Sequence, residues 1–421
     1  MGATRSTSAV ARAVAASALV ILPGCGGDGG DATPRTIGDA SVPVDEGDEP
    51  SRVDRLRGLP YAGSSEVDEG AARGVVLVDE ERSWPGVNLV TIQMLSRAEL
   101  IDASGALLRS WRMPDSDRWE RVELLENGDL LAIGADPAPQ GTRGIPDGSR
   151  YLARFDWDGE LLWKRPMTAH HDVTRGPDGR LYALTFRRRK VAAIHPTLDV
   201  RDDLVVALSE EGDELERRSL LGGFRRSPDA MAITPVAPDR IGVEPWIDLF
   251  HTNSLEWARR PGLFGAHAVH ADGNVLISSR HQNAVFSLDW SERRIVWAWG
   301  KGELQGPHDA RLLENGNVLV FDNGLGRGWS RVVEVEPASS EIVWEYRADP
   351  PESFYTLSKG SSQRLPNGNT LIAESDRGRA FEVTREGEVV WDYYCPHELG
   401  PRKRAAIVRM IRIDPATLPT D

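Results

Sequence analysis

A repeated pattern of short strands and tight turns constrains the fold of this chain more than any other feature. Five segments place an Asn-Gly or Asp-Gly turn between apolar residues: 123–131, 175–184, 270–277, 311–320 and 364–372. These dipeptides supply the positive φ angles that a tight hairpin turn needs. The repeat therefore predicts a series of β-hairpins.

A second hairpin follows the first in each unit, and its last strand often ends in tryptophan, as at Trp163, Trp344 and Trp391. One further copy ends at Trp111 but lacks a clear first hairpin. Four short strands per unit, at a period of roughly 40–50 residues, are typical of a propeller blade. We count six units, beginning near residues 74, 119, 170, 251, 307 and 361. The sequence predicts an all-β, six-bladed β-propeller over residues 73–421. A β-sandwich is the alternative, although it does not require so regular a repeat.

Two stretches, 190–206 and 222–265, interrupt the period. The second contains five prolines and is too long for an ordinary hairpin loop. Long loops on a rigid scaffold are usually functional covers or disordered insertions.

The first 25 residues have the composition of an export signal. Arg5 and Arg12 precede an apolar run, 13–22, that is too short to span a bilayer. The run ends in Leu22-Pro23-Gly24-Cys25, which resembles a bacterial lipoprotein box. That resemblance implies a mature protein that begins at a lipidated Cys25 and is anchored on the periplasmic or extracellular side of a bacterial membrane. An ordinary signal peptide is the alternative.

Residues 26–72 contain eleven Asp and Glu against four Arg, and they are rich in Gly, Ser and Pro. Such a composition predicts a disordered, acidic tether between the signal and the propeller. The net charge of the whole chain, −14, argues against nucleic acid as a partner. Besides Cys25 the chain has only Cys395, so the fold is expected to hold without an internal disulfide.

Two of the nine histidines occupy the same position in their repeats. His171 and His308 each stand eight residues before a turn glycine, and each is followed by an aspartate. Equivalent positions in different blades meet around the central axis, so both side chains are expected in one axial funnel. The aspartates, Asp172 and Asp309, are candidates to orient them. The alternative is that each histidine only caps its strand.

The fourth unit adds His251 and the Arg280-His281 pair. An arginine near histidines at the end of an inner strand is suited to hold a sulfate or phosphate group. His267 and His270 compete with His251 for the axial position by spacing, whereas His195 and His397 stand next to proline in loop-like sequence. His281 beside Arg280 is only a weak indication of a metal site.

Five motifs, in order, give the sequence a specific resemblance. HHDV (170–173), HTNS (251–254), SSRHQ (278–282), PHDARLLENGN (307–317) and FDNG (321–324) are similar to motifs of the bacterial arylsulfate sulfotransferases. The segment 360–372 also resembles sequence in that family. The likeness covers roughly residues 74–396. Members of the family are six-bladed propellers that transfer a sulfuryl group between phenols without a nucleotide donor.

The resemblance implies a catalytic set of three histidines and one arginine. The transiently sulfated nucleophile falls on His308, and the arginine that holds the sulfate oxygens falls on Arg280. The histidine of the HxNS motif falls on His251, although the insertion after that motif leaves His267 open. The third histidine falls on His171, with His170 as the weaker candidate.

The implied reaction needs no cofactor and no metal, and its partners are a phenolic sulfate donor and a phenol acceptor. The sequence contains no cysteine cluster and no carboxylate-rich ligand loop. Two other functions remain open on the same fold. One is a non-catalytic surface binding module, and the other is a hydrolase or lyase that acts on an anionic ester.

Overall fold

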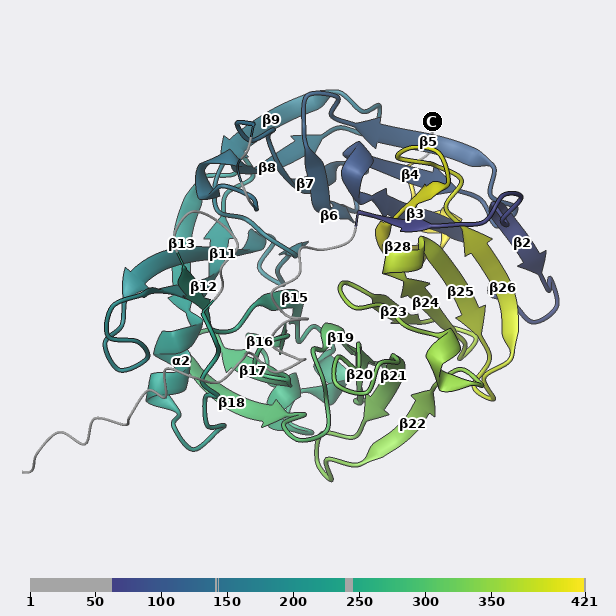
Figure 1. Ribbon diagram of the computed structural model, residues 1–421. Helices are drawn as coiled ribbons and strands as arrows, with labels where there is room; N and C mark the ends of the chain where they lie inside the picture. The colour runs from purple at the N-terminus through teal and green to yellow at the C-terminus, as the bar shows by residue number, and fades with distance from the viewer. Residues whose placement is uncertain (1–62, 141, 143, 239–244, 420–421) are drawn as a thin grey trace, which may run out of the picture. The chain divides into compact units, whose positions relative to one another are not determined.

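The computed structural model describes residues 63–140, 142, 144–238 and 245–419. Six antiparallel sheets of this body stand around a central axis like the blades of a propeller (Figure 1). The predicted six-bladed β-propeller is confirmed. The signal segment 1–25 with Cys25, and the tether up to residue 62, lie outside the described residues. Within those residues, no helix is long and apolar enough to cross a lipid bilayer.

The first three blades alternate short strands and tight turns, as the repeat predicts. Blade 1 contains β3 (Val87–Ile92), β4 (Arg97–Ile101) and β5 (Leu107–Arg112), with β28 (Ile407–Ile413) as its innermost strand. Blade 2 contains β6 (Arg118–Leu124), β7 (Leu130–Ala135), β8 (Arg150–Phe155) and β9 (Leu161–Pro166). Blade 3 contains β10 (Val173–Arg175), β11 (Leu181–Lys190), β12 (Asp199–Leu208) and β13 (Glu214–Ser219), with β14 (Trp246–Asp248) added parallel to β12.

The remaining blades follow in chain order. Blade 4 contains β15 (Thr252–Trp257), β16 (Asn274–Ser279), β17 (Ala284–Asp289) and β18 (Arg294–Trp299). Blade 5 contains β19 (His308–Leu312), β20 (Val318–Asp322), β21 (Arg331–Val335) and β22 (Ile342–Tyr346). Blade 6 contains β23 (Ser361–Arg364), β24 (Thr370–Glu374), β25 (Arg379–Val383) and β26 (Val389–Tyr394), with β2 (Gly74–Val78) at its outer edge.

The two ends of the described chain close the ring, which corrects the expected first unit. The segment that begins at residue 74 is β2, and it pairs with β26 of blade 6 instead of starting blade 1. Blade 1 lacks a first hairpin in the sequence because its inner strand, β28, comes from the C-terminal end. The folded body also begins before residue 73, because β1 (Ser64–Glu66) pairs with β27 (Lys403–Ala405). The predicted tether therefore overlaps the body.

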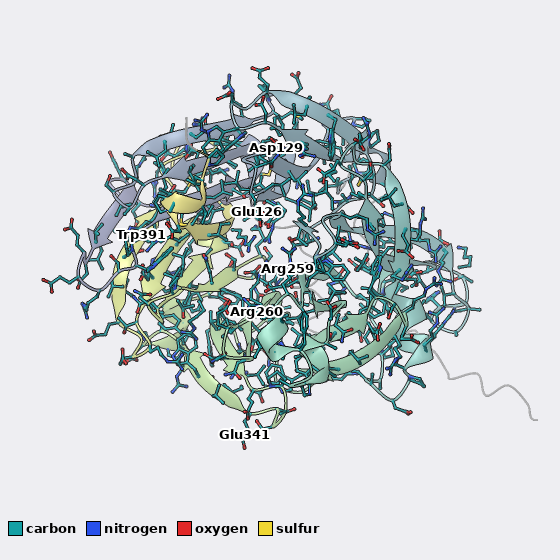
Figure 2. All side chains as sticks on the ribbon, turned by 180° about the vertical axis from the view of Figure 1, so that it is seen from behind. Glu126, Asp129, Arg259, Arg260, Glu341 and Trp391 are labelled. Carbon is teal, nitrogen blue, oxygen red and sulfur yellow. The ribbon has the colours of Figure 1, made fainter. Side chains whose placement is uncertain are left out.

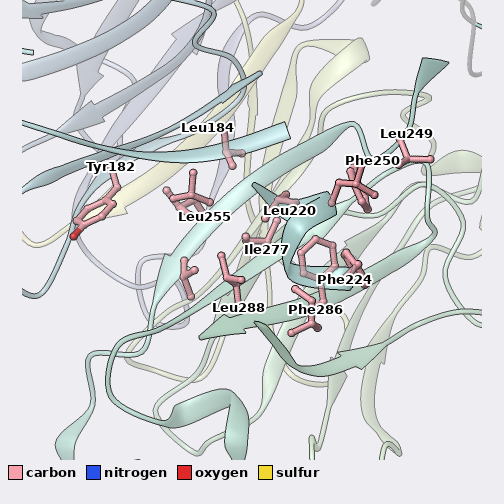
Figure 3. Close-up of a cluster of buried hydrophobic side chains, with 14 of the residues drawn as sticks. Tyr182, Leu184, Leu220, Phe224, Leu249, Phe250, Leu255, Ile277, Phe286 and Leu288 are labelled. Atoms are coloured by element: carbon pink, nitrogen blue, oxygen red, sulfur yellow. The ribbon is translucent and has the colours of Figure 1, made fainter. Parts of the chain in front are cut away.

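Each interface between neighbouring blades contains its own hydrophobic core. Strands in the middle of a blade are buried on both faces, and their side chains alternate between the two neighbours. On β3, for example, Leu89 packs toward blade 2, and the next residue, Val90, packs toward blade 6. The core between blades 3 and 4 also takes in α2 (Leu220–Arg226), where Phe224 packs against Phe250 and Phe286 (Figure 3).

The tryptophans that end the outer strands join each blade to the next. Their indole N–H groups donate to turn carbonyls of the following blade, and the last of them links blade 6 to blade 1. The pairs are Trp111 with Asp156, Trp163 with Glu210, Trp299 with Ser340, Trp344 with Arg385, and Trp391 with Ala103, at 2.8–3.2 Å. Between blades 3 and 4, Arg218 Nε donates instead to Trp290 O at 2.9 Å. The recurring tryptophans therefore link neighbouring blades by hydrogen bonds and help to close the ring.

The stretch 190–206 does not interrupt blade 3. It lies in an extended hairpin, because β11 and β12 have ten residues each and pair along their whole length. The second stretch contains most of α2, then β14, and then β15, the first strand of blade 4. Because β14 pairs with β12, Arg201 of the hairpin lies between the carboxylates of Asp203 and Asp248. This insertion therefore supports the site described next.

Candidate active site

A cavity lies where the six blades meet. Each blade contributes to its wall. The lining includes, from blade 1 to blade 6, Gln93, Arg121, His171, Asn253, His308 and Lys359. The structure therefore brings His171 and His308, which share a repeat position, to one cavity.

His308 is held with one ring nitrogen toward the protein and the other without a partner. Its Nδ1 lies 2.7 Å from Asn323 Oδ1 and 3.1 Å from Gly306 O. The Asn323 amide nitrogen donates to Thr356 O and Lys359 O, both at 2.9 Å, which fixes the amide oxygen toward His308. Both neighbours of Nδ1 are thus acceptors, so Nδ1 carries the proton and Nε2 carries the lone pair.

The His308 ring is neutral at neutral pH. Burial, followed by the positive charge of Arg280, lowers the pKa of His308 to about 3. Its Nε2 is buried and makes no hydrogen bond within the described protein. A neutral imidazole with a bare, unpartnered nitrogen in a cavity is the form that a nucleophile requires.

His251 forms a pair with a buried carboxylate. Its Nδ1 lies 2.5 Å from Asp248 Oδ2, so Nδ1 donates and Nε2 is the nitrogen that takes up or releases a proton. The guanidinium of Arg201 and the two neighbouring histidines, His251 and His281, hold the pKa of Asp248 well below its usual range despite its burial. The ionised carboxylate fixes the Nδ1 proton of His251 and orients the ring.

His171 and His251 lie side by side, with ring centroids 5.0 Å apart. On its other side, His171 Nδ1 lies 2.9 Å from Nδ1 of the buried His170. His170 Nε2 is 3.3 Å from Thr185 O and therefore donates, which leaves His170 Nδ1 as the acceptor. Burial lowers the pKa values of both rings well below the usual range. His170 thus supports His171, and the arrangement leaves the proton of His171 on Nδ1.

Arg280 follows β16 and is almost completely buried, with 1% of its surface exposed. Its backbone N–H donates to His251 O at 3.2 Å. Its side chain packs beside Gly306, two residues before His308, where an added Cβ would lie 3.7 Å from Arg280 Cγ. His281 Nδ1 donates to Asp248 O at 2.6 Å, so His281 Nε2 accepts from the guanidinium of Arg280 at 3.2 Å. His281 therefore orients Arg280.

Four residues around the cavity adopt left-handed backbone conformations although none is glycine. Their φ angles are 60° for His171, 48° for His251, 48° for Asp309 and 60° for Lys359. Such conformations cost free energy and persist where the surrounding structure enforces them. Their concentration around one cavity is typical of a functional site.

The expected role of the two aspartates is wrong. Asp172 and Asp309 do not contact the rings of the histidines before them; they join blades. Asp172 accepts from Leu255 N of blade 4 at 2.8 Å, and Asp309 accepts from Ser362 N of blade 6 at 3.0 Å. The backbone is irregular at both places, because Asp172 precedes β10 and Asp309 (φ 48°) lies at a register shift of β19.

The remaining histidines lie apart from the cavity lining. His267 caps the short 3-10 helix η4 (Ala268–His270) and packs against Trp297, with ring centroids 6.1 Å apart. His270 contacts Gly316 O at 2.6 Å. His195 accepts from Leu198 N, and His397 contacts Glu99 at 3.0 Å. Of the three histidines that compete by spacing in the fourth unit, His251, His267 and His270, the structure places His251 beside His171.

The opposite face of the ring has a second hollow, lined by Arg259, Arg260 and Arg311. Figure 2 shows this face, with Arg259 and Arg260 near the centre and Glu341 at the rim. Arg311 lines this hollow and pairs with Asp309, which lines the axial cavity. The Arg311–Asp309 pair therefore lies between the axial cavity and this hollow.

Comparison with known proteins identifies the family. Residues 121–395, more than half of the chain, match the family described as Arylsulfotransferase (ASST). The chain belongs to the arylsulfotransferase family. The match includes the cavity residues His171, Asn253, His308 and Lys359. No curated protein sequence matches the chain.

Solved structures resemble this arylsulfotransferase-family chain in fold. A protein of unknown function from Bacteroides caccae has 15% identity and a TM-score of 0.51, over 78% of this chain and 98% of its own. A β-propeller domain from Myceliophteria thermophila has 11% identity and a TM-score of 0.42, over 83% and 100%. Virginiamycin B lyase from Staphylococcus aureus has 9% identity and a TM-score of 0.42, over 77% and 88%.

Asp248, His251 and His281 also form a group in which one ligand atom of each lies within 4.8 Å of the others. Such a group is a candidate to hold a metal ion. Here two of its donor atoms already lie beside guanidinium groups. His281 Nε2 faces the Arg280 guanidinium, and Asp248 Oδ2 lies 3.5 Å from Arg201 Nη1 as well as close to His251. Two guanidinium groups beside the ligands disfavour a cation, so the group is better suited to orient side chains for an anion.

Proposed function

We propose that the protein transfers a sulfuryl group from an aryl sulfate to a phenol through a sulfohistidine at His308. The observation that carries the proposal is the His308 ring itself. Asn323 and Gly306 fix its proton on Nδ1, and the bare Nε2 lies buried in the axial cavity without a partner. Membership in the arylsulfotransferase family supports the same reaction class.

In the first half-reaction, the His308 Nε2 lone pair attacks the sulfur of the donor. The N–S bond forms as the S–O bond to the aromatic ring breaks, and the leaving phenolate takes a proton from His251. A phenol has a pKa near that of tyrosine, about 10, so protonation of the departing oxygen lowers the barrier. Asp248 accepts the Nδ1 hydrogen bond of His251 during this step. Arg280 faces the negative charge on the three sulfuryl oxygens.

The second half-reaction reverses these bond changes with a new phenol. His251, now neutral, accepts the phenol proton, the phenol oxygen attacks sulfur, and the N–S bond breaks. His171, beside His251, shares in this proton transfer. The scheme predicts ping-pong kinetics, in which the aryl group leaves before the acceptor binds.

The test of the function is its dependence on an acceptor. With 4-nitrophenyl sulfate and added phenol, we expect continuous release of 4-nitrophenol and formation of phenyl sulfate. Without the added acceptor, release should stop after about one equivalent per enzyme. A sulfatase would continue in water alone, and a non-catalytic binding module would release no product. Either of these results would reject the proposal.

We also propose that the protein is exported and anchored by a lipid on Cys25, outside the cytoplasmic membrane. The support is the apolar run before Leu22-Pro23-Gly24-Cys25. Expressed in a bacterium that processes lipoproteins, Cys25→Ser is expected to move the protein from the membrane to a soluble fraction. Cys395→Ser is the matched control, because Cys395 is buried in the propeller. If the Cys25 variant sediments with membranes as fully as the unchanged protein, the anchor is not at Cys25.

A further inference from the structure

The axial cavity has two halves, of which only one supplies residues to the proposed transfer reaction. Blades 3, 4 and 5 supply the proposed transfer residues, including His171 and His308. Blades 6, 1 and 2 complete the ring and face them across the axis. The mechanism proposed above uses no side chain from this second half. We refer to Lys359, Ser361, Gln93 and Arg121 as the facing wall.

Three residues of the facing wall present buried polar atoms without a hydrogen-bond partner in the described protein. These atoms are Gln93 Oε1, Arg121 Nε and Ser361 Oγ. The residues are 2%, 4% and 2% exposed, respectively, and all three line the cavity. Buried polar atoms in native proteins are nearly always hydrogen-bonded, so an unpaired set around one cavity points to a polar ligand.

The charged groups of the facing wall are compensated within the protein. Lys359 Nζ lies 3.0 Å from Asp376 Oδ1, and Arg121 Nη2 lies 2.8 Å from Asp172 Oδ1. Glu120, which also lines the cavity, pairs with Arg150 at 3.1 Å. The wall therefore offers hydrogen bonds without a large excess of either charge. It is better suited to a neutral hydroxyl group than to a second anion.

Aromatic side chains are scarce in the lining of this cavity. Apart from the two histidine rings, the described residues that line it include no aromatic side chain, and Val408 is the one branched aliphatic residue among them. Lys359 also connects the wall to the nucleophile, because its backbone carbonyl accepts from the Asn323 amide that orients His308. The facing wall and His308 line the same cavity, so a ligand on this wall shares the cavity with the reacting nitrogen.

We propose that the facing wall binds the aromatic part of the acceptor and selects phenols that carry a second, neutral hydroxyl group. Gln93 and Ser361 contribute the hydrogen bonds that recognise this hydroxyl. The inference rests on the proposed sulfuryl transfer. It adds a substrate class and two specificity-determining residues to that function.

The experiment compares two acceptors of nearly equal size, 3-hydroxyphenol and 3-methylphenol, with 4-nitrophenyl sulfate as the donor. For the unchanged protein we expect kcat/KM for 3-hydroxyphenol to exceed that for 3-methylphenol by 10-fold or more, since a site with unpaired polar groups rejects a methyl in place of a hydroxyl. In Gln93→Leu and Ser361→Ala, the ratio should fall several-fold toward one. Gln140→Leu, on the exposed surface, is the matched control and should retain the ratio.

The burst of 4-nitrophenol without acceptor gives the active fraction of each variant, and all rates are divided by it. This burst also separates the two proposals, because its absence in the unchanged protein rejects the sulfuryl transfer itself. A normal burst with equal kcat/KM for both acceptors overturns the facing-wall proposal alone. The facing-wall proposal is also overturned if Gln93→Leu and Ser361→Ala both retain a large ratio of kcat/KM for 3-hydroxyphenol over 3-methylphenol. A 10-fold preference for 3-hydroxybenzoate over 3-hydroxyphenol would show that the wall selects an anion, and it would also overturn the proposal.

Discussion

His308→Asn is expected to abolish both the burst of 4-nitrophenol and the covalent adduct, and to lower the transfer rate by a factor on the order of 10⁵. An amide nitrogen has no lone pair available to attack sulfur, and the other cavity residues cannot replace the nucleophile. Intact-protein mass spectrometry at neutral or alkaline pH should show one added SO₃ group on the unchanged protein after incubation with donor. Addition of phenol should remove it.

His267→Asn is the matched control for this experiment. His267 accepts from Val269 N at the start of η4, and asparagine is equally suited to such a capping position. We expect that variant to keep the burst, the adduct and the transfer rate. An adduct that persists in His308→Asn would move the nucleophile to His251 or His171. Transfer by the unchanged protein without any adduct would favour direct attack of the acceptor on the donor.

Asp309→Asn is expected to cause the largest loss of stability, about 3–5 kcal/mol, because it leaves buried arginines without their counter-charge. Asp309 is 3% exposed and lies at the centre of a charged network near the axis. It pairs with Arg311 of its own blade, and it lies 3.7 Å from Arg121 of blade 2 and 3.9 Å from Arg409 of blade 1. Asparagine keeps the shape of the side chain and removes only the charge.

Thermal unfolding measures the effect, and a decrease in Tm of roughly 4–7 °C is expected for a domain of this size. Glu388→Gln is the matched control. Its partner is Arg82 and both side chains are largely exposed, so the loss there should stay below about 1 kcal/mol. Equal, small effects of both substitutions would show that the axial network contributes little to stability.

The same network predicts how the difference in stability between the unchanged protein and Asp309→Asn changes with pH. Despite its burial, the arginines Arg311, Arg409 and Arg121 hold the pKa of Asp309 well below its usual range. Its contribution to stability is therefore complete above the pKa of the unfolded chain, about 3.9, and is lost as the pH falls through the lower folded value. The stability of the unchanged protein and of Asp309→Asn should differ most near neutral pH and converge in strong acid.

The sequence by itself determined the blades and the axial position of two histidines. Asn-Gly and Asp-Gly turns and the alternation around them are local signals, because a hairpin is encoded within about a dozen residues. His171 and His308 share a distance to their turn glycines, so the repeat alone placed both at the start of an inner strand. The tryptophans that end the outer strands were visible as a pattern, although their role in joining the blades was not.

Only the tertiary structure decided how the ring closes and what orients the site. β28 completes blade 1 from the far end of the chain, and no local signal links these segments. Asp248 reaches His251 because the extended hairpin of blade 3 positions β14. Asn323 reaches His308 from the end of the neighbouring strand β20. Asp172 and Asp309 follow the histidines directly, yet their carboxylates accept hydrogen bonds from the backbone of the next blade. Spacing along the chain gives the position of a side chain, whereas packing between blades determines its partner.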